Sequence, residues 1–437
     1  MKLERLYTVN IPSDVDFKET SKLCGDIGDQ PNQRTQGAHI FLNTKLQFQT
    51  MNGIGGAFSE LGSKALFSLT DDDKETVSKE LFEKFASFRL PIGSSDFGLD
   101  AYSLNDNEDD FEMEKFSLAR DEQYIIPYME MAKKYADDVK IHASPWAPPY
   151  WFKDTKQACG AGSLVNDDKY YKAYAKYFAT YIKEYAKKGF NITRLNIQNE
   201  PEAHPKYPGC DMTVEEMAKL IRYFIHPMFK EEGIKTEIFA GTFRAVNEAT
   251  ATEFLSQDDE IQNYVDGIGC QYSTMQPLYE ITAKYPKLKL MHTESNCFRG
   301  ENSWPQAIVL YTSIVNYMNA GCDTFTYWNM ILNTNGESTW GWRQNSLVTI
   351  DEEAKTYTYN PDFYVYKLAK ECIASGSKRI SYASRNKLGI AFKNEDGSVS
   401  FMVSNFSDKE EVGDVTVDGV KLDLTLAPMS ISAFKIS

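Results

Sequence analysis

The sequence lacks the features of a membrane protein, a nucleic-acid-binding protein and a secretory precursor. Its first residues, MKLERLYTVN, contain no apolar core of the signal-peptide type, and no run in the 437 residues approaches the roughly 18 apolar residues that a membrane span needs. Basic residues are in deficit, since 47 Lys and Arg stand against 62 Asp and Glu, for a formal net charge of −15. Nucleic acid and anionic membrane surfaces are therefore not expected as partners. We expect a soluble protein, cytoplasmic as the sequence is written; a secreted protein trimmed of its signal peptide would look identical.

The chain also lacks the patterns that would hold a metal ion or a nucleotide cofactor. Its seven cysteines lie far apart, no C-x-x-C pair occurs and the number is odd, which argues against a structural zinc site and against a complete disulfide framework. No G-x-G-x-x-G or P-loop motif appears where a nucleotide-binding sheet would place one. We therefore expect neither a metal ion nor a cofactor. The composition, with 42% apolar and 25% charged residues, is that of an ordinary globular protein long enough for one large domain and an accessory.

Short apolar segments alternate with longer helical patterns from residue 48 to about 375, which is typical of a parallel sheet with crossover helices. The helical patterns include Lys74–Ser87, Asp121–Tyr135, Val214–Phe229 and Pro305–Asn319. The eight strand candidates are Gln49–Gly53, Phe88–Ile92, Lys140–Ala143, Arg194–Ile197, Glu237–Ala240, Gly267–Gln271, Lys289–His292 and Thr324–Trp328. Eight such units predict a (β/α)₈ barrel, which we prefer to a doubly wound open sheet because the nucleotide motifs are missing.

The last sixty residues change to short alternating strands separated by turn residues, which predicts an antiparallel β module. These strands are Leu388–Phe392, Val399–Asn405, Val412–Val417, Leu422–Leu426 and Ser430–Ile436. The N-terminal pieces Leu3–Val9 and His39–Lys45 are strand-like and have no helix of their own, so we expect them to join this module. The predicted organisation is a barrel over residues 46–375 and an accessory β-sandwich built from residues 1–45 and 376–437.

The strongest local signal is Asn199-Glu200-Pro201, at the end of the fourth predicted strand. Barrel enzymes keep their reactive groups at the carboxyl ends of the strands, so this position places a carboxylate at the mouth of the barrel. The Asn199 amide lies beside it. The purely structural alternative is a polar strand end that a proline terminates.

A second carboxylate, in Thr293-Glu294-Ser295, ends the seventh predicted strand. Alone, this tripeptide would be read as a capped helix start. Strands four and seven lie on opposite walls of a barrel, however, so Glu200 and Glu294 would face each other. Retaining glycosidases need two carboxyl groups roughly 5–5.5 Å apart, one protonated to assist the leaving group and one ionised to attack the anomeric carbon. The pair therefore predicts a retaining glycoside hydrolase.

Further strand ends carry side chains that suit a sugar. The segments are Arg89–Phe97, Ala143–Trp151 and Thr326–Asn329. A carboxylate such as Asp96 can accept two sugar hydroxyls, and the indole faces of Trp146 and Trp328 can cover the apolar side of a pyranose. Each residue singly could equally be a turn aspartate or a core tryptophan. Their convergence at one end of the barrel favours a sugar site.

Together these motifs resemble glycoside hydrolase family 30, which includes glucosylceramidases and β-1,6-glucanases. They occur in family order over residues 50 to 350, and the flanking β segments fit the side domain of that family. The matching pieces are Gly55–Glu60, Arg89–Phe97, Ala143–Trp151, Asn199-Glu200-Pro201, Thr293-Glu294-Ser295 and Tyr327-Trp328-Asn329.

The resemblance implies that Glu200 is the general acid/base and Glu294 the nucleophile. It also implies that Asp96, Trp146, Asn199 and Trp328 surround the sugar, and we expect both tryptophans to border the pocket that holds the two glutamates. Glu200 must hold a proton near neutral pH, and the negative charge of Glu294 is one cause that would raise its pKa.

The sixth predicted strand departs from the family pattern. Family members often carry a histidine near an aromatic residue there, whereas this chain reads Gly269-Cys270-Gln271-Tyr272. We expect Gln271 or Tyr272 to take over that contact, and we count Tyr272 among the substrate-binding residues.

The sequence thus favours hydrolysis of a β-glucoside by double displacement, with β-1,6-glucan, a gluco-oligosaccharide or a glucosylceramide-like glycoside as substrate. A β-xyloside or β-fucoside is the alternative within the same family. A non-catalytic carbohydrate-binding protein on the same scaffold would usually have lost one carboxylate, and both are present. Transglycosylation would use the same residues.

Overall fold

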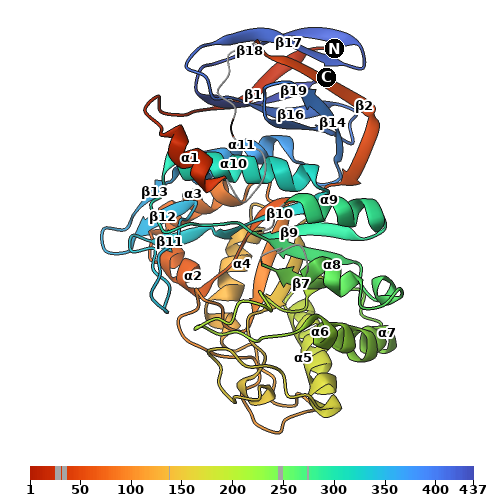
Figure 1. Ribbon diagram of the computed structural model, residues 1–437. Helices are drawn as coiled ribbons and strands as arrows, with labels where there is room; N and C mark the ends of the chain where they lie inside the picture. The colour runs from red at the N-terminus through yellow and green to blue at the C-terminus, as the bar shows by residue number, and fades with distance from the viewer. Residues whose placement is uncertain (25–30, 32–36, 137, 245–249, 273–274) are drawn as a thin grey trace.

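Eight parallel strands close into a barrel at the centre of the molecule, in the order β10-β3-β4-β5-β6-β7-β8-β9 (Figure 1). The computed structural model describes residues 1–24, 31, 37–136, 138–244, 250–272 and 275–437. The barrel strands are β3 (Gly53–Ala57), β4 (Ser87–Ile92), β5 (Lys140–Pro145), β6 (Ile192–Asn196), β7 (Glu237–Phe243), β8 (Gly267–Gln271), β9 (Lys289–Glu294) and β10 (Cys322–Asn329). The predicted barrel is confirmed, and its strands from β4 onward overlap the predicted segments.

The first barrel strand is β3, and the prediction of Gln49–Gly53 for it is wrong. Gln49 and Thr50 instead end β2 (His39–Thr50), which belongs to another sheet. Glycines in β3 weaken the sequence signal for a strand, yet close packing requires them. A Cβ atom on Gly55 would lie 1.5 Å from the carbonyl oxygen of Ser87 on the neighbouring strand.

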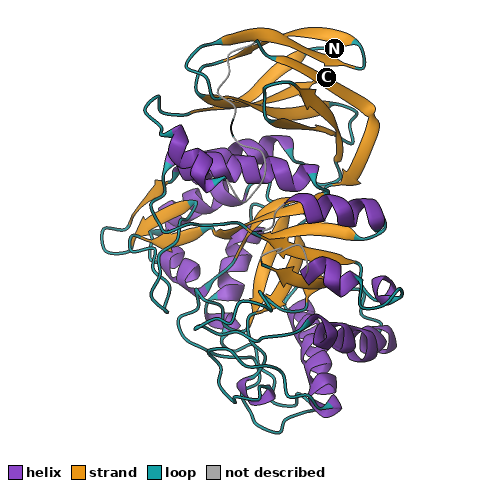
Figure 2. Ribbon diagram, in the orientation of Figure 1, coloured by secondary structure: helices purple, strands orange, loops and turns teal. Residues whose placement is uncertain are grey.

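Helices on the outside of the barrel connect its strands (Figure 2). They are α2 (Glu60–Phe67), α3 (Asp71–Phe82), α4 (Ile125–Lys133), α5 (Asp168–Lys187), α6 (Val214–Leu220), α7 (His226–Glu232), α8 (Thr250–Leu255), α9 (Met275–Lys284) and α10 (Trp304–Asn319), with α1 (Phe17–Leu23) ahead of the barrel and α11 (Pro361–Cys372) after its last strand. Short 3₁₀ turns lie at Asp121–Gln123, Tyr150–Phe152 and Ile261–Asn263.

Two helices differ from the sequence prediction: one is interrupted by a π turn, and the other ends earlier than predicted. The run Val214–Phe229 is interrupted by a π turn over Ile221–Ile225, because Pro227 has no N–H to continue the α-helical ladder. The run Lys74–Ser87 ends early: α3 stops at Phe82, and Lys84 adopts a φ of 66°, outside the helical region.

The accessory domain is one eight-stranded sheet in the order β1-β19-β16-β15-β14-β2-β17-β18. Its other strands are β1 (Leu3–Asn10), β14 (Lys378–Ser384), β15 (Gly389–Lys393), β16 (Val399–Asn405), β17 (Glu411–Val417), β18 (Val420–Leu426) and β19 (Ser430–Ile436). The N-terminal strands join the C-terminal ones, as the sequence predicts, and the predicted boundary at residue 46 falls inside β2. The pairing is not wholly antiparallel, since β2 runs parallel to β17.

The sheet curls around a hydrophobic core of its own, which gives it the two-layered form of a sandwich. Strands from both halves contribute buried side chains, among them Ile40, Phe401, Val415, Leu424 and Phe434. A further small sheet, β11 (Ile331–Asn333), β12 (Val348–Asp351) and β13 (Thr356–Tyr359), was not predicted. It follows the last barrel strand and packs against α2.

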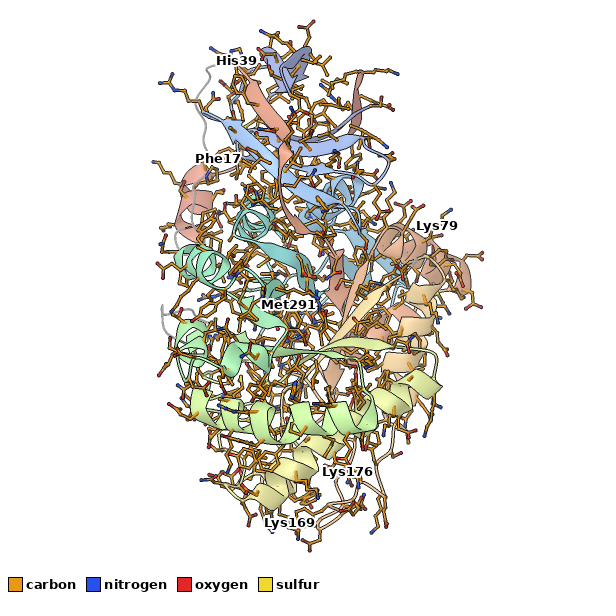
Figure 3. All side chains as sticks on the ribbon, turned by 90° about the vertical axis from the view of Figure 1, so that its right-hand side faces the viewer. Phe17, His39, Lys79, Lys169, Lys176 and Met291 are labelled. Carbon is orange, nitrogen blue, oxygen red and sulfur yellow. The ribbon has the colours of Figure 1, made fainter. Side chains whose placement is uncertain are left out.

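The labelled side chains in Figure 3 show the length of the molecule. His39 lies in the accessory sheet at one end, Lys169 on α5 at the other, and the buried Met291 on β9 between them. Within the described ranges, no helix is long and apolar enough to cross a lipid bilayer.

Candidate active site

A pocket of about 510 Å³ lies at the carboxyl ends of the barrel strands. Glu294 is the last residue of β9, while Glu200, Tyr272 and Asp96 follow the ends of β6, β8 and β4. All of them line this pocket, together with Tyr207, Arg244, Asn296, Trp342 and Gln344. The two glutamates that the sequence pairs are thus in one cavity.

Glu200 is only 7% exposed, and both of its carboxylate oxygens are held. The Gln271 amide donates to Oε1 over 2.8 Å, and the Tyr207 hydroxyl donates to Oε2 over 3.0 Å. Burial, and next the negative charge of Glu294, raise the pKa of Glu200 to about 7. A carboxyl group with this pKa is protonated in a large share of molecules at neutral pH and can act as a general acid.

The backbone at Glu200 is held in an unusual conformation, with a φ of 45°. Its N–H donates to the carbonyl of Thr242 over 3.0 Å, and the N–H of Asn199 donates to the carbonyl of Pro145 over 2.8 Å. These bonds to both neighbouring strands hold a left-handed backbone that a non-glycine residue seldom adopts. Residues in such conformations cluster at functional sites.

Glu294 is held as an ionised carboxylate would be. The Tyr272 hydroxyl donates to Oε1 over 2.6 Å, and the Arg89 guanidinium donates to Oε2 over 2.5 Å. Arg89 is completely buried and also donates to Ser144 Oγ and Asn199 Oδ1. A carboxylate that accepts from a buried guanidinium and from a phenol is held in a fixed orientation, as a nucleophile must be.

Asp96 is the third acid of the pocket. Burial first, and then the charges of Glu294 and Glu200, raise its pKa well above the usual range of an aspartate. The three acids cannot all be ionised at small cost in one buried pocket. A protonated Asp96 can donate a hydrogen bond to a sugar hydroxyl as well as accept one.

Trp146 and Trp328 do not line the pocket, which corrects the prediction that they border it. Each indole is 1% exposed, and the two rings stack on each other with centroids 5.1 Å apart. The guanidinium of Arg89 lies over both, 4.6 Å from the Trp146 ring and 5.6 Å from that of Trp328. The tryptophans therefore form the floor beneath Arg89, where cation–π attraction and exclusion of water stabilise the charge pair.

Asn199 is likewise absent from the pocket lining. Its Oδ1 accepts from Arg89 over 2.7 Å and from the Thr242 hydroxyl over 3.1 Å. Asn199 therefore helps to orient the guanidinium of Arg89. Direct contact of Asn199 or of either tryptophan with a sugar remains a proposal.

The sequence analysis gave no role to Arg89, which lies buried beside the pocket, or to several residues that line it. Arg89 had a signal, because a charged side chain inside the apolar segment Phe88–Ile92 needs a buried partner. Tyr207, Arg244 and Trp342 come from loops, where no periodicity marks a residue. The rings of Tyr207 and Trp342 lie 5.1 Å apart and form one wall of the pocket.

Replacing Arg89 with Met is expected to lower the free energy of unfolding by about 3–5 kcal/mol, because Glu294 is then buried without its cation. Chemical denaturation followed by tryptophan fluorescence measures this. The double variant Arg89→Met/Glu294→Gln is the matched control and should recover part of the loss. Equal stability of wild type and Arg89→Met would contradict the ion pair.

Replacing Trp146 with Ala is expected to cost about 3–5 kcal/mol of folding free energy, because it empties a fully buried site. The matched control is Trp342→Ala, which removes a half-buried indole from the pocket wall and should cost clearly less. The same denaturation experiment compares the two. A larger loss of folding free energy for Trp342→Ala would contradict the buried position of Trp146.

The arrangement offers acid–base and nucleophilic chemistry by side chains. Among the residues outside the undescribed gaps, no three His, Cys, Asp or Glu side chains gather as a metal ion would need.

The chain is similar to known proteins over most of its length. Residues 51–371 match the model of the glycosyl hydrolase family 30 TIM-barrel domain. Putative glucosylceramidase 1 of Caenorhabditis elegans is 29% identical over 397 residues, which cover 84% of this chain and 76% of the relative. Endo-1,6-beta-D-glucanase of Neurospora crassa is 25% identical over 386 residues, covering 82% and 79%.

One solved structure is similar to this chain in fold. The endo-beta1,6-glucanase BT3312 superposes with a TM-score of 0.82 at 24% identity, covering 93% of this chain and 95% of that one. This similarity is evidence for the fold alone. The family match spans the whole barrel, from β3 to α11, and includes Glu200 and Glu294. The chain therefore belongs to glycosyl hydrolase family 30.

Proposed function

We propose that this protein is a retaining β-glycoside hydrolase that cleaves a β-glucoside by double displacement. The leading substrates are β-1,6-glucan or a gluco-oligosaccharide, followed by a glucosylceramide-like glycoside. The names of the relatives, glucosylceramidase and endo-1,6-beta-D-glucanase, support a β-glucoside without choosing between the two.

One observation carries the proposal: two glutamates in one pocket have opposite environments. Glu294 is paired with a buried guanidinium, while Glu200 has hydrogen-bond donors but no cation in direct contact among the described residues. A carboxyl beside a cation suits attack on the sugar, and a carboxyl with a raised pKa suits proton donation, so these environments divide the two roles.

In the first step, Glu294 attacks the anomeric carbon while Glu200 gives its proton to the leaving oxygen. The bond between that carbon and the oxygen breaks, the aglycone leaves as a neutral alcohol, and the sugar becomes an ester of Glu294. Arg89 and Tyr272 lose a charged partner as the ester forms. Their hydrogen bonds to Oε2 and Oε1 position the carboxylate for attack beforehand.

In the second step, Glu200 acts as a base. Esterification removes the charge of Glu294, which is the second cause of the raised pKa of Glu200, so Glu200 ionises more readily. It takes a proton from a water molecule, whose oxygen attacks the anomeric carbon and releases Glu294. Both inversions together retain the configuration of the sugar.

A panel of 4-nitrophenyl β-glycosides tests the sugar, followed by β-1,6-glucan to test the linkage. We expect the β-glucoside to have the highest kcat/KM. A higher kcat/KM for the β-xyloside or β-fucoside would identify that sugar, in place of glucose, as the one the protein prefers. Binding of glucosides without any turnover would identify a carbohydrate-binding protein instead.

The pH dependence follows from the raised pKa of Glu200. The acid form is present below about 7 and is lost as the pH rises through that value, so kcat/KM for 4-nitrophenyl β-glucoside should fall on the alkaline side with a midpoint near 7. A 2,4-dinitrophenyl β-glucoside needs little proton assistance and serves as the control, with a much weaker fall. Identical alkaline limbs for both substrates would contradict the acid role.

A further inference from the structure

The two oxygens of Glu200 are held by groups of different chemistry. Oε1 accepts from the Gln271 amide, whose own oxygen accepts from the Thr293 hydroxyl over 2.9 Å. The same hydroxyl also lies 3.2 Å from the carbonyl oxygen of Cys270, and when it donates to Gln271 the NH₂ end of the amide faces Glu200. An amide NH₂ group donates hydrogen bonds and cannot accept one, so a proton on Oε1 would find no acceptor in Gln271.

The hydroxyl at the other oxygen has no such restriction. Tyr207 donates to Oε2 over 3.0 Å when Glu200 is ionised, and a phenol can also accept a hydrogen bond when the carboxyl is protonated. We propose that Glu200 carries its deliverable proton on Oε2 and that Tyr207 is the positioning residue that holds this oxygen in both protonation states. This inference rests on the acid/base role proposed above.

Glu200 and Tyr207 account for the proton transfers in both steps of the reaction. In the acid step, the Oε2 proton moves to the leaving oxygen, and the Tyr207 hydroxyl turns to donate to the new negative charge on Oε2. In the base step, Oε2 takes a proton from the attacking water, and Tyr207 becomes an acceptor again or yields to the next substrate. Gln271 keeps its bond to Oε1 throughout.

The backbone that carries Tyr207 is fixed by a buried lysine. Lys153 is completely buried, and its ammonium group donates to the carbonyl of Gly160 over 2.8 Å and to that of Gly209 over 2.7 Å. The N–H of Gly160 in turn donates to the carbonyl of Tyr207 over 3.0 Å. Because these loops are tied together and the ring packs on Trp342, Tyr207 is in place before substrate arrives.

Other charged and titratable groups also act on Glu200. Glu294 disfavours its charged form, Arg244 favours it, and Asp96 and Tyr272 lie close enough to be affected by the charge of Glu200. Replacing Tyr207 with Phe changes none of them. A change in the titration of Glu200 in that variant is therefore attributable to the lost hydroxyl.

The first test needs no turnover, so it stands apart from the proposed function. Neutron diffraction from deuterium-exchanged crystals of the full chain at acidic pD should show a deuteron on Oε2 of Glu200, directed at the Tyr207 oxygen. Gln271 should present its ND₂ group to Oε1. A deuteron on Oε1, facing a reversed Gln271 amide, would overturn the inference.

The second test is the pH profile of Tyr207→Phe on 4-nitrophenyl β-glucoside. The alkaline limb of kcat/KM should move up by about one pH unit, because a hydrogen bond to an ionised carboxylate is stronger than one from the neutral acid. The matched control is Tyr174→Phe, which removes a buried hydroxyl that has no hydrogen-bond partner among the described residues and should leave the limb in place. A uniform loss of activity in Tyr207→Phe with an unmoved limb would reduce Tyr207 to a packing role.

Discussion

Replacing Glu294 with Gln is expected to lower kcat on every glycoside by at least ~10⁴-fold, because an amide has no negative charge with which to attack the anomeric carbon. The loss should be equally severe for 4-nitrophenyl and 2,4-dinitrophenyl β-glucoside, since a better leaving group does not replace a missing nucleophile. Steady-state kinetics measure it. Turnover within tenfold of wild type would contradict the role.

The control for that experiment is the fold of the variant. The amide oxygen introduced by Glu294→Gln could still accept from Arg89, but the guanidinium would lose its ionised partner, so some loss of stability is expected. Circular dichroism and the melting temperature should show a folded protein at the assay temperature. Activity lost through unfolding would otherwise be mistaken for chemistry.

Replacing Glu200 with Gln should give a different pattern. Hydrolysis of 4-nitrophenyl β-glucoside should fall by about 10²–10⁴-fold because the proton donor is gone. The dinitrophenyl substrate should still release dinitrophenol in a burst, after which the glycosyl-enzyme accumulates without a base to activate water. Rapid-mixing absorbance measurements separate the burst from the slow phase.

Azide provides the matched test of the division of roles. It needs no general base, so it should restore turnover of Glu200→Gln and yield a β-glucosyl azide. Nuclear magnetic resonance of the product identifies its anomeric configuration. Rescue with that same product in the Glu294→Gln variant would reverse the assignment of the two glutamates.

Much of the fold could be predicted because its strands are apolar and regularly spaced. The strands from β4 to β10 have such signals, and the C-terminal strands alternate visibly. The exceptions have local causes. Strand β3 is rich in glycine because its neighbour approaches too closely for a side chain at Gly55, and glycine is the residue that strand patterns discount.

The reactive pair could be predicted because each glutamate ends a strand within a short motif. Asp96 and Tyr272 were also predicted and line the same pocket, whereas the hydrogen-bond partners of Glu200 were not predicted. The hydrogen bonds of Glu200 come from Tyr207, on a loop, and from Gln271, on a different strand, and only the closed barrel brings them together. The departure from the family pattern at Gln271 was visible in the sequence, but its partner was not.

The tryptophans illustrate a limit of motif reasoning. A Trp at a strand end suits a sugar, yet Trp146 and Trp328 lie under Arg89, one layer below the pocket. Their positions along the strands are correct, whereas their side chains support the charged pair. A sequence motif indicates that a residue contributes to the site. It does not indicate whether the side chain lines the pocket or packs beneath it.

The central claim is that Glu294 forms a covalent bond to the sugar, and trapping tests it most directly. The protein is incubated with 2-deoxy-2-fluoro-β-glucosyl fluoride, which forms the ester but slows its hydrolysis, and is then digested for peptide mass mapping. We predict one fluoroglucosyl group per chain, on the peptide that contains Glu294 and on that side chain. A label on Glu200, or full inactivation without a label on either glutamate, would contradict the account.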